Sequence, residues 1–389
     1  MCSNTTAPHT LIHQLREAVE HPEWYESHGP EIASLARRTA TAVEGPFERF
    51  YSIVHAAFPI VAIRICQEHK VIHTLTENAS KGQPTTNTSA LSRQTGLSRS
   101  MLETLLEYLA SKSYVNRVSS NEFAPTSVTN MLLTPLFMDG IKLYHDTLIP
   151  VYIAWNSFLS DPKGRSSVFQ LAHNTPNELY EWMKHHPDQG AAFHTYMNHQ
   201  LDSLPGWLDA INFLDEFAQN TSANTPLFVD VGGGKGQQCA GLLTKYPNLK
   251  GRVILQDLSS VIQDAVTDSR VERMSYDFFT EQPVKHARAY YFRQVFHNND
   301  DSSCTDIIKS LLPAMGQSSV LLIDDIVLSD EEPPSEYIAG ISLTMMALFN
   351  AYERRESQWR SLLDKTGLRI TAIKRFTRFG EGIIVAVKK

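Results

Sequence analysis

Apolar residues in the first half of the chain recur at intervals of three and four positions. The pattern covers residues 11–20, 31–58 and 101–115, and no alternation typical of strands competes with it there. It predicts amphipathic helices. Residues 87–126 then give a helix, a turn at Gly96, a Ser-capped second helix and a short polar hairpin, which is the order of a winged helix.

From Thr225 the pattern changes to short β-rich runs separated by helix-like segments. The runs are residues 226–234, 251–258, 288–296 and 319–328. Apolar strands that alternate with helices indicate a parallel sheet covered on both faces. The third run is expected to be a buried strand that ends on His297. Residues 366–389 hold two strand-like runs with no helix between them, so an antiparallel hairpin is expected at the sheet edge.

Composition favours a globular protein with a small-molecule partner. The chain has 389 residues, 42% of them apolar, and a net charge of −7, which argues against a main role in binding nucleic acid or an anionic membrane. The four cysteines are spaced for neither a disulfide framework nor a metal site, so we expect no metal. The most apolar run, residues 53–66, contains His55 and Arg64 and falls short of a membrane span. With no signal peptide pattern at the N-terminus, we expect a cytoplasmic protein.

The winged-helix pattern raises the possibility of a DNA-binding regulator. The helix that would enter the major groove carries Glu103 and Glu107, which would face phosphates unfavourably. A helical dimerisation module is therefore the favoured interpretation, and the regulator remains an alternative that predicts salt-sensitive binding to duplex DNA.

A glycine-rich loop is the most informative local signal. A strand of β-branched residues runs into Gly232, Gly233, Gly234 and Gly236, and a helical pattern follows directly. The spacing G-x-G-x-G departs from the dinucleotide fingerprint, and no Lys-Ser/Thr follows to make a phosphate loop. Asp230, two residues before the loop, would repel a pyrophosphate but could receive an ammonium group or an amine. The ligand is therefore expected to lack phosphate.

Two further acids complete the pattern of this site. Asp257 ends the second strand, where a carboxylate can take both ribose hydroxyls of an adenosyl group. Asp277 follows the next strand and would suit the adenine amino group. The ordered set predicts a site for S-adenosylmethionine (SAM) that also includes Leu258, Phe278 and Arg293.

Residues 228–387 resemble the fungal small-molecule O-methyltransferases of the plant caffeic-acid type. The resemblance rests on FVDVGGGKG, GRVILQDL, LLIDDIVL, LTMMA and ERRESQW, and weaker likeness extends it over residues 40–389. It implies a class I Rossmann-like α/β domain at 129–389 whose helical segment, about 129–222, forms the substrate pocket. It also implies a winged-helix-like dimerisation domain at 1–128 and a homodimer with intertwined N-terminal helices, in which Tyr51 and Phe58 would reach the partner's pocket.

The resemblance gives His297 the role of the base that takes a proton from a substrate hydroxyl. The positions that match its two flanking carboxylates are Asp325 and Glu353, which could hydrogen-bond one imidazole nitrogen and fix its tautomer. Where the family has Asp-Trp after this histidine, the chain has Asn298 and Asn299. Asparagine cannot act as a base near pH 7.

The loss of Asp-Trp beside a retained cofactor loop bears on the reaction type. The chain is similar in this respect to the O-methyltransferase-like pericyclases of fungal pyridone-alkaloid pathways, in which SAM stays bound and no methyl group moves. In that reading Arg293, His297 and Asn298 act as donors that stabilise a polar transition state of dehydration or cyclisation of a quinone-methide-type intermediate. An O-methyltransferase acting on a phenol or enol is the alternative. The expected pocket residues are His145, Phe193, Met197, Met346 and Asn350.

Overall fold

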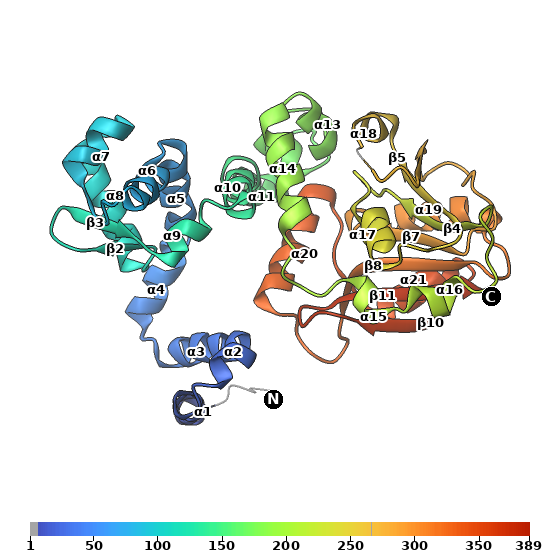
Figure 1. The fold of residues 1–389 in the computed structure, drawn as a ribbon, viewed down its shortest axis with the longest axis horizontal. Helices are drawn as coiled ribbons and strands as arrows, with labels where there is room; N and C mark the ends of the chain where they lie inside the picture. The colour runs from blue at the N-terminus through green and yellow to red at the C-terminus, as the bar shows by residue number, and fades with distance from the viewer. Residues whose placement is uncertain (1–6, 266) are drawn as a thin grey trace. The chain divides into compact units, whose positions relative to one another are not determined.

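The computed structural model describes residues 7–265 and 267–389, and these form two compact units divided between Leu132 and Leu133 (Figure 1). The sequence placed the boundary after residue 128, which falls inside α9 (Ser127–Met131). Two hydrogen bonds tie α9 to the first unit: Thr129 Oγ1 donates to the Tyr114 carbonyl, and Gln67 Nε2 donates to the Leu132 carbonyl. The short helix therefore closes the first unit.

The first unit is helical with one small sheet. Its remaining elements are α1 (Pro8–Glu20), α2 (Trp24–Ser27), α3 (Gly29–Val43), α4 (Pro46–Val54), α5 (Phe58–Glu68), α6 (Val71–Ser80), β1 (Thr86–Asn87), α7 (Thr88–Thr95), α8 (Arg99–Ser111), β2 (Val115–Arg117) and β3 (Glu122–Pro125). The strands form an antiparallel sheet in the order β1-β3-β2. The helix, turn, helix and hairpin expected over 87–126 are therefore present in that order, with Ser98 accepting the N-cap bond of α8.

The long apolar run expected over residues 31–58 is not one helix. It breaks between α3 and α4 and again at residues 55–57, so that Tyr51 lies on α4 and Phe58 on α5. Pro46 and Pro59 each lie in the first turn of a helix, where the missing N–H removes no intrahelical bond. Proline thus sets new helix starts within an otherwise continuous pattern.

One stretch, Pro46–Glu68, is long and apolar enough to cross a membrane by length and composition alone. It extends the run considered in the sequence, residues 53–66, in both directions. The backbone of the stretch is interrupted at residues 55–57. Its second part buries Ala62, Ile63 and Cys66 in the first unit, as a core helix of a folded domain does.

The second unit is built on a mixed sheet with the strand order β10-β11-β8-β7-β4-β5-β6. Its strands are β4 (Pro226–Val231), β5 (Arg252–Asp257), β6 (Val271–Ser275), β7 (Ala289–Arg293), β8 (Val320–Leu328), β10 (Leu368–Arg375) and β11 (Glu381–Lys388), while the short β9 (Arg354–Arg355) pairs with β8 off this path. Strands β6, β5, β4, β7 and β8 are parallel, and β10 and β11 form the expected antiparallel hairpin. The predicted α/β class is correct.

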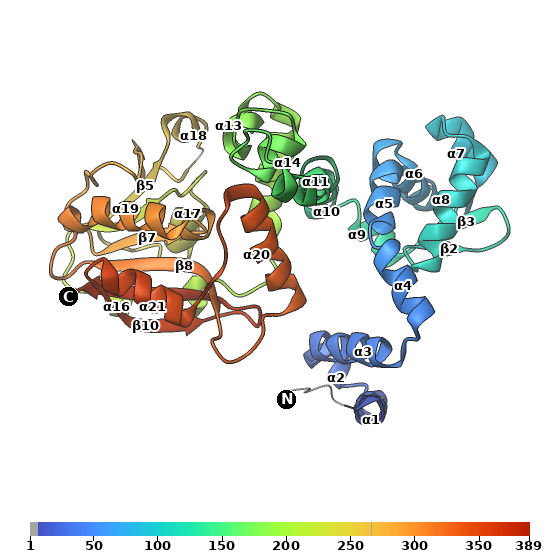
Figure 2. The same cartoon turned by 180° about the vertical axis from the view of Figure 1, so that it is seen from behind.

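Successive side chains along the central strands pack on opposite faces of this sheet. Tyr290 and Phe292 join the cluster formed with α19 (Asp301–Leu311) and α21 (Glu356–Lys365), whereas Tyr291 joins the cluster formed with α17 (Gln237–Lys245). Figure 1 shows α17 on one face, and Figure 2 shows α19 and α21 on the other. Because both faces are covered, the central strands β4, β7 and β8 are mostly apolar.

A helical segment precedes the sheet. It contains α10 (Pro135–Leu143), a π-helical turn (Tyr144–Leu148), α11 (Ile149–Ser160), α12 (Val168–Ala172), α13 (Leu179–Lys184), α14 (Pro187–His199), α15 (Trp207–Ala210) and α16 (Phe213–Phe217). The helix α20 (Glu336–Phe349), which follows β8, packs against α11 and α12. Pro150 cannot donate the backbone bond that an α-helix needs there, which accounts for the π turn just before it.

Candidate active site

The glycine loop between β4 and α17 is attached to the end of β5. The amides of Gly232 and Gly233 donate to the Gln256 carbonyl at 2.8 and 3.2 Å, and the Gly234 amide donates to Asp257 Oδ2 at 2.8 Å. Gly232, Gly234 and Gly236 have φ angles of 70°, 59° and 86°, in the left-handed region that glycine adopts without strain. The loop thus follows a path that only glycine takes easily.

The space around each glycine separates packed positions from an open one. A Cβ atom at Gly233 would lie 2.5 Å from Cγ of Asp230, and one at Gly236 would lie 2.7 Å from Cγ2 of Thr267. At Gly234 a Cβ atom would meet nothing nearer than Gln237 Oε1 at 4.0 Å. The backbone of Gly234 is therefore the part of the loop that a ligand can approach.

Asp257 lies beside this open position with both carboxylate oxygens fixed. Oδ2 accepts the Gly234 amide, and Oδ1 accepts the Leu258 amide at 2.7 Å. Partial burial raises the pKa of Asp257, although the two amide bonds oppose that rise. Each oxygen keeps a second lone pair, which suits the two adjacent hydroxyls of a ribose. The carboxylate and the glycine cradle fit an adenosyl group.

The other predicted cofactor residues surround the same end of the sheet. Leu258 is half exposed. Phe278 packs close to Gly232, since a Cβ atom added at Gly232 would lie 3.7 Å from the Phe278 ring. Asp277 is exposed after β6, and its Oδ1 accepts the Phe279 amide at 3.0 Å, which shapes the turn.

Asp230 occupies a different place from the one the sequence suggested. It is fully buried below Gly233, and its Oδ2 accepts the Cys239 thiol at 3.6 Å. Burial raises the pKa of Asp230 to about 7. A direct contact with a cofactor amine does not fit this burial, because the loop lies between the carboxyl group and the open side. Asp230 supports the loop from below.

Arg293 ends β7 beside buried acids. Its Nε lies 3.9 Å from Asp324 Oδ2, and the hydroxyl of Tyr291 donates to the same carboxylate. Burial alone would lower the pKa of Arg293, but the charges of Asp324, Tyr291 and Asp230 outweigh it and raise the pKa. The guanidinium is therefore a fixed positive charge next to the cofactor end of the sheet.

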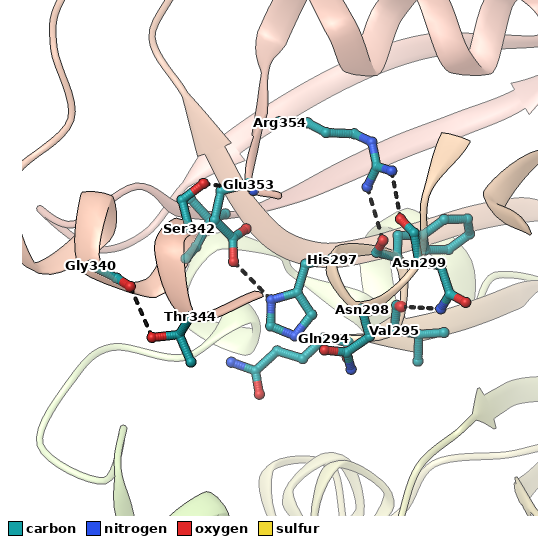
Figure 3. A network of polar contacts seen from close by, with 12 residues as sticks. Gln294, Val295, His297, Asn298, Asn299, Gly340, Ser342, Thr344, Glu353 and Arg354 are labelled. Atoms are coloured by element: carbon teal, nitrogen blue, oxygen red, sulfur yellow. Dashed lines mark hydrogen bonds and ion pairs between the residues drawn. The ribbon is translucent and has the colours of Figure 1, made fainter. Parts of the chain in front are cut away.

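His297 does not end a strand, as the sequence suggested. Strand β7 stops at Arg293, and His297 lies on the short 3-10 turn Phe296–Asn298. Its Nδ1 contacts Glu353 Oε1 at 2.9 Å, and both side chains are buried, with 7% and 2% of the residue exposed. Figure 3 shows the second ring nitrogen turned away from Glu353, toward the side chains of Gln294 and Asn298. Glu353 therefore orients the ring, as the sequence predicted.

Charge around the ring decides its protonation. Burial would lower the pKa of His297, but the charge and hydrogen bond of Glu353, with the charge of Asp325, raise it to about 9. Asp325 makes no hydrogen bond to His297 or to any other described residue, so it acts on the ring through its charge alone. Burial raises the pKa of Asp325 to about 7. The neighbouring carboxylates thus favour the protonated form of the imidazole.

Arg354 is a functional residue that the sequence analysis missed. It is fully buried, and its guanidinium donates to the Phe296 carbonyl at 2.9 Å and to the Asn299 carbonyl at 2.7 Å (Figure 3). A third bond goes to Asp301 Oδ1 at 2.9 Å. The first two bonds hold both ends of the turn that carries His297. Only its place directly after Glu353 gave any signal in the sequence.

The two asparagines after His297 face the backbone. Asn298 Nδ2 donates to the Gln294 carbonyl at 2.9 Å and to the Tyr180 hydroxyl at 3.3 Å, while Asn299 Nδ2 donates to the Val295 carbonyl at 2.8 Å. A carbonyl oxygen only accepts, so the amide orientation of Asn298 is fixed and Oδ1 is its remaining group. In this arrangement Asn298 presents an acceptor, whereas the sequence predicted a donor, and its role toward a substrate stays a prediction.

Tyr180 connects part of the predicted pocket to the turn that carries His297. Its ring stacks on Phe349 at 5.6 Å between centroids and meets the edge of Phe193 at 5.9 Å. Phe193 is thus placed near Asn298 through Tyr180, which the sequence analysis did not name. Met197 lies one turn further along α14, with its sulfur 3.3 Å from Gln200 Nε2.

For the remaining predicted pocket residues, His145, Met346 and Asn350, the described part of the chain shows no hydrogen bond to His297, although α20, which carries Met346, packs against the turn of His297. His145 Nδ1 contacts Asp146 Oδ1 at 2.6 Å on the π turn. Asn350 ends α20 in the left-handed conformation, and its amide donates to the Met346 carbonyl at 3.1 Å. Asn350 therefore has a capping role, which its sequence position did not reveal.

Helix α14 is attached to the cofactor loop. The side chain of Gln237, at the start of α17, donates to Asn198 Oδ1. His194 on the same helix has a lowered pKa because of burial and of the Lys235 charge in the loop. The helical segment and the glycine loop thus meet within one unit.

Comparisons with known proteins agree with this arrangement. The O-methyltransferase domain family matches residues 160–369. The 16-O-methyltransferase bsc6 of Alternaria brassicicola is 33% identical over 91% of this chain and 90% of its own length. A solved structure described as a pericyclic reaction enzyme has a TM-score of 0.86 and 27% identity, and covers 97% of this chain and 100% of that chain.

The structure of LepI in complex with SAM also has a TM-score of 0.86, with 26% identity and coverage of 97% of this chain and 100% of that chain. The family match covers more than half of the sequence, and the fungal relative extends it over most of the rest. The fold is that of class I methyltransferases with a helical N-terminal region. The chain belongs to the O-methyltransferase domain family of SAM-dependent enzymes.

Proposed function

We propose that this protein is a SAM-dependent pericyclase of fungal secondary metabolism on an O-methyltransferase scaffold. The observation that carries the proposal is the setting of His297, which is buried and bonded through Nδ1 to Glu353. Against the effect of burial, that bond and the charges of Glu353 and Asp325 raise the pKa of His297 to about 9. A cationic imidazole cannot take a proton from a hydroxyl, but it can donate one. The similarity to a pericyclic reaction enzyme supports this reading.

In the proposed dehydration, His297 acts through the nitrogen that faces away from Glu353. The N–H of the imidazolium gives its proton to a departing hydroxyl, the C–O bond breaks and water leaves. The neutral imidazole then takes a hydroxyl proton from the conjugated substrate, which restores the imidazolium and gives the quinone-methide-type intermediate. Glu353 holds the ring throughout, and its charge stabilises the imidazolium. Cyclisation of that intermediate then needs only an enclosed site that keeps the reacting ends together.

The cofactor is proposed to lie along the glycine loop. Gly234 would offer the open backbone, Asp257 the ribose acceptor, and Leu258, Asp277 and Phe278 the surroundings of the adenine. When bound, SAM supplies a positive sulfonium centre or, in a transferase, a methyl group. Arg293 is proposed to contribute a second fixed positive charge, because Asp324 keeps it protonated at the same end of the sheet.

An alanine at Gly234 is expected to weaken SAM binding at least tenfold while the protein still folds. The new methyl group would point to the open side of the loop, where only Gln237 lies within 4 Å, so it obstructs a ligand and not the core. The φ of 59° adds a strain of about 1 kcal/mol for a non-glycine residue. Titration calorimetry with SAM, beside a thermal melt, measures both effects. Unchanged affinity would contradict the proposed placement of the cofactor.

The second candidate is an O-methyltransferase acting on a phenol or enol. The bond between Glu353 and His297 favours it, because the same geometry orients a general base once the ring has lost its proton. The 16-O-methyltransferase bsc6 is similar over most of the chain. The two candidates differ in whether SAM is consumed.

Product analysis distinguishes the two candidates. The protein is incubated with SAM and a hydroxylated polyketide-type intermediate, and mass spectrometry follows the substrate and S-adenosylhomocysteine. The pericyclase predicts loss of water or an isomeric product, with SAM unchanged over many turnovers. Accumulation of S-adenosylhomocysteine in step with a methylated product would overturn it.

The pH dependence of turnover gives an independent test. If His297 donates a proton, kcat stays level below the pKa of about 9 and falls tenfold per pH unit above it. If the neutral ring must act as a base, kcat instead rises tenfold per unit up to the same pH. Glu353→Gln removes the negative charge that raises the pKa of His297. The pH at which the slope of the kcat profile changes should therefore be lower in this variant in either case. The sign of the slope therefore decides between acid and base.

We further propose that the protein is a homodimer formed through its N-terminal helices, as the family resemblance implies. Helix α4 carries exposed apolar side chains that a second copy would cover, namely Phe47, Phe50, Tyr51, Ile53 and Val54. DNA binding remains the less favoured alternative, because Arg99 and Arg117 are paired with Glu103 and Glu107. Light scattering after Phe50→Lys tests the dimer: a dimeric mass that is unchanged in the variant would count against this surface.

A further inference from the structure

Gln294, next to the catalytic turn, has an uncommon backbone conformation. Its φ is 53°, in the left-handed region that non-glycine residues adopt rarely and at a cost of about 1 kcal/mol or more. Two bonds hold it there: its amide donates to the Asp324 carbonyl at 3.0 Å, and its carbonyl accepts Asn298 Nδ2 at 2.9 Å. The surroundings thus fix a conformation that the residue alone would avoid.

This conformation directs the Gln294 side chain to His297. Figure 3 shows the Gln294 side chain passing the second imidazole nitrogen, with its carboxamide on one side of that nitrogen and the Asn298 carboxamide on the other. The side chain is partly buried, and its amide has no hydrogen-bond partner among the residues that the structure describes. Because polar groups in such a position usually find a hydrogen-bond partner, this amide is open to a partner from outside the chain, such as a ligand.

Three groups therefore converge with hydrogen-bonding capacity left over. The outward nitrogen of His297 donates when the ring is protonated, Asn298 keeps Oδ1 as an acceptor, and the Gln294 amide both donates and accepts. One hydroxyl at His297 would use only part of this capacity. The set matches a substrate with two oxygen atoms close together.

We infer that Gln294 is a specificity-determining residue that binds a second oxygen next to the reacting hydroxyl. The substrate class is then an enolised 1,3-dicarbonyl or an ortho-acyl phenol, in which a carbonyl and a hydroxyl oxygen lie about 2.5–3 Å apart, the usual spacing of hydrogen-bonded oxygens. Gln294 donates to the carbonyl while His297 serves the hydroxyl. The inference rests on the proposed placement of the reacting hydroxyl at His297, and it holds for either reaction type.

Two isomeric probes test the inference without any turnover. The affinities of 2,4-dihydroxyacetophenone and 3,5-dihydroxyacetophenone are measured by calorimetry in the presence of saturating S-adenosylhomocysteine. The isomers have the same size and groups, but only the first places a hydroxyl beside the acyl carbonyl. The unaltered protein is expected to prefer it at least tenfold, and Gln294→Leu is expected to bring the two affinities within about twofold.

A second variant separates the amide from the strained backbone. Gln294→Gly adopts the positive φ freely, so it should lose the preference as fully as the leucine variant while its melting temperature stays level or rises. Affinity for S-adenosylhomocysteine should not change in either variant. Equal affinities in the unaltered protein, failure of both probes to bind, or a preference that persists in Gln294→Leu would each overturn the inference. None of these results depends on whether SAM is consumed, so the proposed function is judged separately.

Discussion

Replacing Arg354 by lysine is expected to lower kcat at least a hundredfold while SAM affinity stays within about threefold. The guanidinium fork bonds the carbonyls of Phe296 and Asn299 at the two ends of the turn that carries His297. A lysine ammonium is a point charge that cannot span both acceptors in one plane. A buried carbonyl left without a partner costs about 1–3 kcal/mol, and the turn is expected to relax. A shift of about 1 Å at the catalytic group is enough for a hundredfold loss.

The neighbouring residue provides a matched control. Arg355 has the same side chain but donates to the Ser329 carbonyl and makes no hydrogen bond to the turn among the described residues, so Arg355→Lys should keep kcat within about threefold. Steady-state kinetics, SAM calorimetry and a thermal melt are measured on both variants, together with the pH at which kcat breaks. A positioning role predicts that Arg354→Lys changes kcat and the break in the pH profile. If kcat falls only in proportion to the folded fraction, Arg354 is merely structural.

The cofactor half of the site could be predicted from the sequence because its signals are local. Gly232 to Gly236 follow a strand directly, and Asp257 ends the next one. Parallel strands bring their carboxyl ends to one edge of the sheet, so spacing along the chain becomes spacing in the site. The burial of a side chain is harder to predict from the sequence. Asp230 has the right position in the sequence, yet its carboxyl group is covered by the loop.

The substrate half depends on contacts between distant residues, which no local pattern encodes. Tyr180 reaches Asn298 from a helix 118 positions earlier in the chain. Arg354 donates to backbone carbonyl groups, which every residue has. The side chains of the turn therefore could not show that Arg354 binds it. The left-handed conformation of Gln294 has no sequence signature either, because glutamine is not a residue that usually adopts it.

The chemistry at His297 likewise depends on how its neighbours are arranged in space. The sequence placed two carboxylates near the ring and treated them as equivalent. In the structure Glu353 bonds Nδ1, while both oxygens of Asp325 lack a partner among the described residues. A bonded and an unbonded carboxylate together hold the ring positive. Under the proposed function, this arrangement lets His297 act as a proton donor, and under the alternative the same Glu353 bond orients it as a base.

Removing the carboxylate of Asp257 is expected to weaken SAM binding by two to four orders of magnitude. A hydrogen bond to a charged group contributes about 1.5–3 kcal/mol, and Asp257→Ala would lose two ribose contacts together with the anchor of the Gly234 amide. Asp257→Asn keeps the shape of the side chain but offers one acceptor oxygen in place of two. Its affinity for SAM should therefore lie between those of the unaltered protein and Asp257→Ala.

Asp277→Ala serves as the control, since this carboxylate is exposed and bonds only the Phe279 amide among the described residues. Its loss is expected to stay below about tenfold, the value of one weak contact. Titration calorimetry with SAM and with S-adenosylhomocysteine measures all three variants, and the two ligands should weaken equally because they share the ribose. If Asp257→Ala binds both ligands within tenfold of the unaltered protein, the adenosyl group does not lie at the end of β5. The orientation of any cofactor relative to His297 would then have to be drawn anew.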